Sequence, residues 1–130
     1  MSWFKKRDEP PRLVPVEGDR GSVLVTGLGC KLDDLPRAFG QLDAVSEYEL
    51  EGVLRPMPRN EWNATPIEVW VNRVHIGYVN DSDSPRYWSS LRRMKALVSC
   101  QCVVKTTGVP VGRSHQIGKV RLSLPRHLQP

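Results

Sequence analysis

The sequence predicts a mostly β protein with two short helices (α+β), folded as a small antiparallel β-barrel of the OB-like or SH3-like kind. The chain has 130 residues, of which 39% are apolar and 25% charged, enough for one domain with a modest core. About six segments have the composition of strands, and most connections between them are too short for parallel crossovers. Short antiparallel strands in so small a chain favour a bent sheet that closes on itself.

Composition divides the chain into an arm, a domain and a tail. Residues 1–20 contain three prolines and nine charged residues without a sustained apolar period, which predicts a flexible arm with a short strand near residues 13–16. Residues 21–125 form the expected single barrel domain. Residues 126–130 are then a short C-terminal tail.

The first half of the domain predicts a strand, a helix and a long strand. Residues 22–26 read Ser-Val-Leu-Val-Thr between two glycines, which is typical of a strand. Residues 33–42 predict a short helix capped by Asp33 or Asp34, because apolar residues recur there at helical spacing. Residues 47–57 alternate apolar and polar side chains and predict a half-buried strand.

The second half predicts a hairpin, a helix and two further strands. Residues 67–71 and 74–79 are β-forming and are joined by the two residues Asn-Arg, as in a tight hairpin. A helix from residue 84 to about 95 is expected, capped by Ser82 or Ser84 and started by a proline. Its predicted buried stripe consists of Tyr87, Trp88, Leu91 and Met94. Two further strands are expected at residues 97–106 and 115–124, with a turn between them at residues 108–112.

Charge is distributed unevenly along the chain. Residues 1–83 carry ten Lys or Arg and fourteen Asp or Glu, whereas residues 84–130 carry nine Lys or Arg and no acidic side chain. A basic segment of this kind, with a pI of about 9.4 for the whole chain, is typical of nucleic-acid-binding proteins. The same pattern also fits a basic face that serves solubility alone.

Three cysteines bear on compartment and on metal binding. An odd number of cysteines, no membrane-length apolar segment and no secretory signal predict a cytoplasmic protein without a membrane association. Cys100 and Cys102 lie two apart and share one face of a strand, so together with Cys30 and a histidine they are weak candidates for a zinc site. Buried free thiols are the favoured interpretation.

The histidines do not suggest catalysis. His75, His115 and His127 are scattered, and no Ser or Cys stands beside a His and a carboxylate in a recognisable catalytic arrangement. We therefore expect neither an enzyme nor a cofactor.

An ordered set of motifs between residues 51 and 91 carries a family resemblance. The chain reads Gly-Val-Leu-Arg-Pro, then Asn-Glu-Trp-Asn, Pro-Ile-Glu-Val-Trp-Val and Ile-Gly-Tyr-Val, followed by Arg-Tyr-Trp at the start of a helix. Together with Val-Thr-Gly upstream, this order resembles the HIRAN domain, of the stand-alone bacterial or phage type, over about residues 22–105. The resemblance implies a modified OB-like barrel with two helices.

The resemblance also implies a function in DNA repair or processing. HIRAN domains that are fused to DNA helicases grip the 3′ end of single-stranded DNA, with bases stacked on aromatic side chains. In this chain Trp62 stands at the aromatic position of the family loop, Asn60 at the first polar contact position, and Asn63 in place of the loop aspartate. Tyr78 replaces a histidine of the end-binding members.

The leading hypothesis is a non-catalytic module that binds single-stranded DNA or DNA ends. Its predicted contacts are Trp62, Asn60, Asn63 and Tyr78 together with the basic residues Arg92, Arg93, Lys105, Arg113 and Arg121. The alternatives are a protein-interaction module that has lost the DNA site and a zinc-supported domain. If the basic residues share a face with Trp62, nucleic-acid binding is favoured; if they scatter, protein interaction or solubility is favoured.

Overall fold

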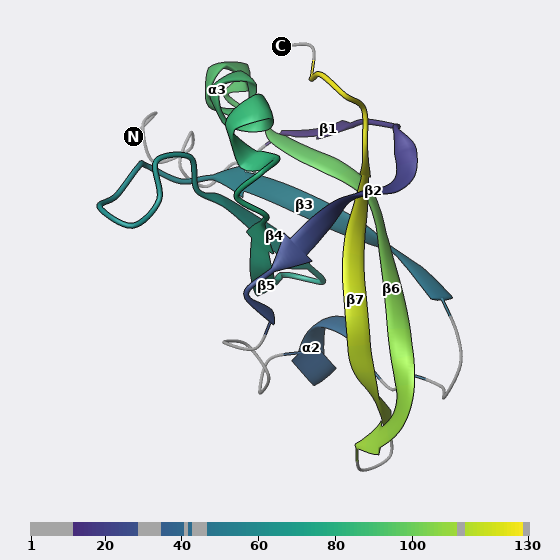
Figure 1. The fold of residues 1–130 in the computed structure, drawn as a ribbon. Coiled ribbons are helices and arrows are strands. Elements are labelled where there is room, and N and C mark those ends of the chain that lie inside the picture. The colour runs from purple at the N-terminus through teal and green to yellow at the C-terminus, as the bar shows by residue number, and fades with distance from the viewer. Residues whose placement is uncertain (1–11, 29–34, 41, 43–46, 112–113, 129–130) are drawn as a thin grey trace, which may run out of the picture.

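A closed β-barrel with one additional strand and two helices makes up the described part of the chain (Figure 1). The structure is a computed structural model that describes residues 12–28, 35–40, 42, 47–111 and 114–128. Its elements are β1 (Leu13–Pro15), β2 (Asp19–Thr26), α2 (Leu35–Phe39), β3 (Glu47–Pro56), β4 (Ile67–Val71), β5 (Val74–Val79), α3 (Ser84–Met94), β6 (Leu97–Val111) and β7 (Ser114–Leu124).

The sheet closes because its longest strands pair with each other. The strand order is β1-β6-β3-β4-β5-β2-β7, and β6 also pairs with β7. Every pair within the barrel is antiparallel, whereas β1 adds to β6 in parallel, with Leu13 opposite Leu97. The predicted fold class, a mostly β chain with two helices and a small antiparallel barrel, is thereby confirmed.

Alternation along the strands fills the barrel with aliphatic side chains. Successive side chains of a strand point to opposite faces, so every second residue faces the interior. Leu54, Val69, Ile76 and Cys102 have no solvent-exposed surface. Tyr87 of α3 is also buried, and its hydroxyl donates to the carbonyl of Pro125 at 2.8 Å.

The hairpin of β4 and β5 matches the prediction and anchors α2. Asn72 and Arg73 have φ values of 49° and 64°, as a two-residue turn of the mirror-image type requires. The Asn72 side-chain amide donates to the carbonyl of Ala38 at 2.6 Å, which fixes α2 at this end of the barrel. In Figure 1, α3 lies above the sheet and α2 lies below it, beside the β6–β7 hairpin.

The seam between β2 and β5 explains a glycine of the predicted motif. The two strands are in register over two pairs, Val25 with Val79 and Thr26 with Tyr78. A Cβ atom on Gly77 would lie 2.4 Å from the carbonyl oxygen of Thr26. Only glycine lets the two backbones approach this closely.

The prediction of a turn at residues 108–112 is wrong for residues 108–111, which belong to a strand. β6 continues through Val111 and, with β7, forms a long hairpin that extends beyond the barrel (Figure 1). Register shifts between Lys105 and Thr106 and between Thr106 and Pro110 absorb the irregular residues, as β-bulges do. Position 112 itself lies outside the described residues.

Both helices differ from the prediction at their ends. α2 spans Leu35–Phe39 and is shorter than predicted, while its predicted caps at 33 and 34 lie outside the described residues. The expected cap of α3 by Ser82 or Ser84 is wrong: Asp83 holds the N-cap position without a side-chain cap bond. Asn80 instead stabilises the turn that leads into α3, because its side-chain oxygen accepts from the N–H groups of Ser82 and Asp83 at 3.1 Å.

The ends of the described chain are part of the fold. β1 and the start of β2 lie within the segment for which we expected an arm, and the N–H of Val16 donates to the carbonyl of Ser99 at 2.9 Å. Leu128, in the expected tail, is 5% exposed and joins the core. No helix among the described residues combines the length and the apolar character needed to cross a membrane.

Candidate nucleic-acid interface

The loop between β3 and β4 presents a tryptophan to solvent. The side-chain oxygen of Asn60 accepts from the backbone N–H groups of Trp62 and Asn63 at 2.9 and 2.8 Å, and the Asn60 N–H donates to the Asn63 carbonyl. The side chain of Asn63 in turn accepts from the N–H of Thr65. The loop is thus held by its own side chains while the Trp62 ring is 86% exposed.

The same loop is fastened to α3 at both of its ends. The indole N–H of Trp88 donates to the carbonyl of Met57 at 2.9 Å, and the hydroxyls of Thr65 and Ser84 lie 2.8 Å apart. The loop therefore projects outward beside α3 (Figure 1). Side chains of the loop and of α3 belong to one end of the molecule.

Two arginines gather on the half-buried ring of Trp88. The guanidinium carbons of Arg59, from the loop, and Arg92, from α3, each lie 5.1 Å from the centroid of the Trp88 ring. At this distance a cation is attracted to the negative face of the ring. The indole thus holds two positive charges together that would otherwise repel each other.

Arg92 also lines a hollow of about 300 Å³ beside the end of α3. Arg55 and Lys95 line it as well. Within the described part of the chain, these three cations form no ion pair. We call Arg55, Arg59, Trp88, Arg92 and Lys95 the α3 basic face.

Tyr78 belongs to a different group of side chains. Its ring makes an edge contact with His75 at 4.9 Å between centroids, and His75 stacks on Trp70 at 5.4 Å. The carboxylate of Glu68 accepts from the Trp70 indole at 3.1 Å and lies 3.7 Å from His75. No contact among the described residues joins Tyr78 to Trp62, so the structure does not bring these two predicted stacking residues together.

The predicted basic residues divide in the same way. Arg93 is exposed on α3 next to Arg92, whereas Lys105 stands opposite Lys119 in the β6–β7 hairpin. The Arg121 guanidinium donates to the carbonyl of Gly21 at 3.4 Å, on the side where β7 meets β2. Arg113 lies outside the described residues. Lys105 and Arg121 are therefore remote from the Trp62 loop, and only Arg92 and Arg93 lie on the helix beside it. The predicted basic set is thus divided between two regions and does not by itself favour nucleic-acid binding over protein interaction.

Sequence reasoning missed most of the α3 basic face. Trp88 was expected in the buried stripe of the helix, since helical spacing alone does not separate a buried ring from a half-buried one. Its spacing of four from Arg92 was the available signal, because such residues are neighbours on a helix surface. Arg55 and Arg59 come from a strand and a loop, so no local pattern could associate them with α3.

The two described cysteines face the barrel interior. Cys100 and Cys102 are free and buried, and burial raises the pKa of each thiol to about 12. The carboxylate of Glu51 further raises the pKa of Cys100. Among the described residues no group of three or more His, Cys, Asp or Glu side chains is placed to hold a metal ion, and Cys30 lies outside them.

Comparisons of this chain with protein-family models, with curated proteins and with solved structures found no match.

Proposed function

We propose that this protein is a non-catalytic module that binds single-stranded DNA or DNA ends in DNA repair or processing. The observation that carries the proposal is the Trp62 ring, which is 86% exposed on a loop that is tied to the α3 basic face. The exposed indole offers a flat apolar face on which a nucleic-acid base can stack.

The arrangement supplies both contacts that binding of a single strand requires. Stacking of a base on Trp62 contributes about 1–3 kcal/mol and tolerates any base. Arg59 and Arg92, held on Trp88, offer guanidinium groups to the phosphates next to that base. The resemblance to the HIRAN domain supports the same proposal, since Trp62 stands at the aromatic position of the family loop.

A fluorescence-anisotropy titration with a short labelled oligothymidylate tests this proposal. We expect saturable binding that weakens as salt rises, because each phosphate contact releases a counterion. Trp62→Ala should lower the affinity by about 1–3 kcal/mol, roughly 5- to 150-fold, without lowering the melting temperature.

Arg73→Gln is the matched control for Arg59→Gln, since each substitution removes one positive charge. Arg73 is exposed in the β4–β5 turn, next to Asn72, whose side chain bonds to Ala38 of α2. The Arg73→Gln variant should bind the oligothymidylate with the affinity of the unmodified protein. Absence of binding at low and moderate salt, or an affinity unchanged by Trp62→Ala, would contradict the proposed function.

Trp62 also supports a second candidate, a protein-interaction module. An exposed tryptophan is a common anchor in protein interfaces. In that case a partner recovered by pull-down should persist after nuclease treatment, and it should be lost with Trp62→Ala but kept with Arg59→Gln. Single-strand binding predicts that both substitutions weaken the interaction.

A further inference from the structure

The hollow beside α3 brings together residues that are far apart in the sequence. It lies where the end of β3 meets the C-terminal end of α3 and the start of β6. Its lining combines a basic rim with an apolar floor, from Arg55, Pro56, Leu91, Arg92, Lys95 and Leu97. Its volume of about 300 Å³ leaves room for a phosphate group with part of its sugar.

The charge of this hollow is unusual for its size. Three of its lining residues are cations and none is a carboxylate, although acids are frequent in the first 83 residues. The closest acid in the strand ladder is Glu68, opposite Arg55. Its carboxylate is already engaged by the Trp70 indole and lies near His75. Neither Glu68 nor another acid among the described residues forms an ion pair with Arg55, Arg92 or Lys95, so the three cations lack an anionic partner within the described part of the chain.

The backbone at Lys95 provides a second observation. Lys95 ends α3 with a φ of 51°, in the left-handed region. Glycine is the common residue at such a helix end, because a Cβ atom is strained there. A lysine at this position gives up stability that a glycine would provide, as side chains needed for a function often do.

The negative end of the helix dipole offers a simpler explanation for two of the cations. Arg92 and Lys95 are in and just after the last turn of α3, where positive charge stabilises a helix. Arg55, however, comes from β3 and is not part of that helix. The helix dipole therefore does not explain why Arg55 lines the hollow, whereas a ligand site does.

We propose that this hollow is a phosphate-binding site, formed by the Arg55, Arg92 and Lys95 side chains. The inference deepens the proposed function, on which it rests, by assigning the place of one phosphate of the bound strand. Arg92 connects the two contacts, because it lines the hollow and also lies over Trp88, whose indole holds the Trp62 loop. A strand with one phosphate in the hollow would then pass Trp88 and Arg59 toward Trp62.

Inorganic phosphate alone is the first probe. An amide NMR titration at constant ionic strength, with chloride in the matched sample, should show saturable shifts at residues 95–97 and at the Arg55 side chain. The expected dissociation constant is on the order of millimolar for one small anion on an open site. Shifts that do not saturate, or that are as large at Arg73 as at Lys95, would overturn the proposal.

Two single substitutions separate phosphate binding from fold stability. Arg55→Gln should weaken phosphate binding roughly tenfold at an unchanged melting temperature, since each charged hydrogen bond to phosphate contributes strongly. Lys95→Gly should also weaken binding while it raises the melting temperature by roughly 2–6 °C, because it relieves the left-handed strain. If Arg55→Gln leaves phosphate binding unchanged, the helix-dipole explanation holds and the proposal fails.

Oligonucleotides then distinguish the source of the phosphate. A 5′-phosphorylated oligothymidylate and its 5′-hydroxyl equivalent are compared on the unmodified protein and on Arg55→Gln. Loss of affinity for the phosphorylated strand alone assigns a terminal phosphate, and equal loss for both assigns an internal one. If the strand binds through Trp62 but Arg55→Gln affects neither oligonucleotide, the inference fails while the proposed function stands. If inorganic phosphate binds but neither strand does, the proposed function fails while the phosphate site stands.

Discussion

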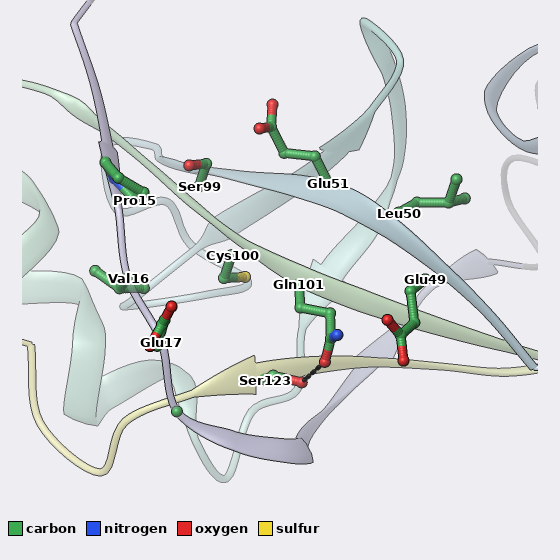
Figure 2. A pocket seen from close by; sticks show the side chains of 11 residues that line it. Pro15, Val16, Glu17, Glu49, Leu50, Glu51, Ser99, Cys100, Gln101 and Ser123 are labelled. Carbon is green, nitrogen blue, oxygen red and sulfur yellow. Dashed lines mark hydrogen bonds between the residues drawn. The ribbon is translucent and has the colours of Figure 1, made fainter.

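Two hollows of the same barrel carry opposite charge. The larger one, of about 600 Å³, lies between the segment after β1 and strands β3 and β6, and its charged lining residues are Glu17, Glu49 and Glu51 (Figure 2). The smaller one, beside α3, has Arg55, Arg92 and Lys95 as its charged residues. A polyanion is repelled from the first and attracted to the second, so the comparison predicts which surface binds nucleic acid.

β3 contributes to both hollows. Glu49 and Glu51 line the acidic hollow, and Arg55, four residues further along the strand and on the same face as Glu51, lines the basic hollow. The first 83 residues carry all the acidic side chains, yet this one strand from them contributes both negative and positive charge, at different positions along its length. The division of charge at Asp83 is not a division into two domains, because strands from both parts form one barrel.

Neutralising the basic hollow beside α3 gives the largest expected effect. The triple variant Arg55→Gln/Arg92→Gln/Lys95→Gln should bind a single-stranded oligonucleotide at least about 30-fold more weakly, a loss of about 2 kcal/mol. The slope of affinity against salt should also fall, because fewer counterions are released. Anisotropy titrations over a salt series measure both quantities.

The matched control is Glu17→Gln/Glu49→Gln/Glu51→Gln. These substitutions remove three charges from the other hollow, together with the exposed ion pair of Glu49 with Arg20, which contributes little to stability. Affinity should stay the same or rise slightly. A loss as large as that of the basic triple variant would show that the two hollows do not differ in function.

The fold was predictable from local signals, and its exceptions have physical causes. The Asn72-Arg73 turn and the alternation in residues 47–57 are set by neighbours in the sequence, so the predicted hairpin and strand are confirmed. The segment around Gly108 and Pro110 has the composition of a turn, but a two-stranded hairpin beyond the barrel leaves one strand edge in solvent. There a proline lacking its N–H does little harm.

The candidate site was only partly predictable. Trp62 was identified because it stands at the aromatic position of the loop in the resemblance to the HIRAN domain, and Arg92 because it belongs to the basic segment that follows the last acidic residue of the chain. Arg55 was missed, since its place beside α3 depends on how β3 enters the barrel. Tyr78 was predicted to join Trp62, but the outer face of β4 and β5 pairs it with His75 instead.

An intermediate effect is expected for the thiols near the acidic hollow. Burial raises the pKa of Cys100 and Cys102 to about 12, above the ordinary value of about 9. Between these values an unfolded chain releases thiol protons that the folded chain retains, so the free energy of unfolding should fall as pH rises from about 9 toward 12. Urea denaturation at a series of alkaline pH values measures this decline.

Other groups titrate in the same range, so the double variant Cys100→Ala/Cys102→Ala is the reference. Its decline in stability with pH should be smaller than that of the unmodified protein, even if its stability at neutral pH is lower. Glu51→Gln should bring the pKa of Cys100 closer to its ordinary value, because the carboxylate raises it. Equal pH dependence in all three proteins would contradict the assignment of the thiols to the core.

The smallest effect concerns the one carboxylate of the loop that carries Trp62. Glu61 is exposed beside Trp62 and should repel the phosphates of a bound strand. Glu61→Gln is therefore expected to raise the affinity about twofold at low salt, and the gain should vanish at high salt, where exposed charges are screened. Glu51→Gln changes the net charge equally but acts at the acidic hollow, so its affinity should stay unchanged. If both variants gain equally in an anisotropy titration, net charge and not position governs binding, and the two hollows would then be electrostatically equivalent for this ligand.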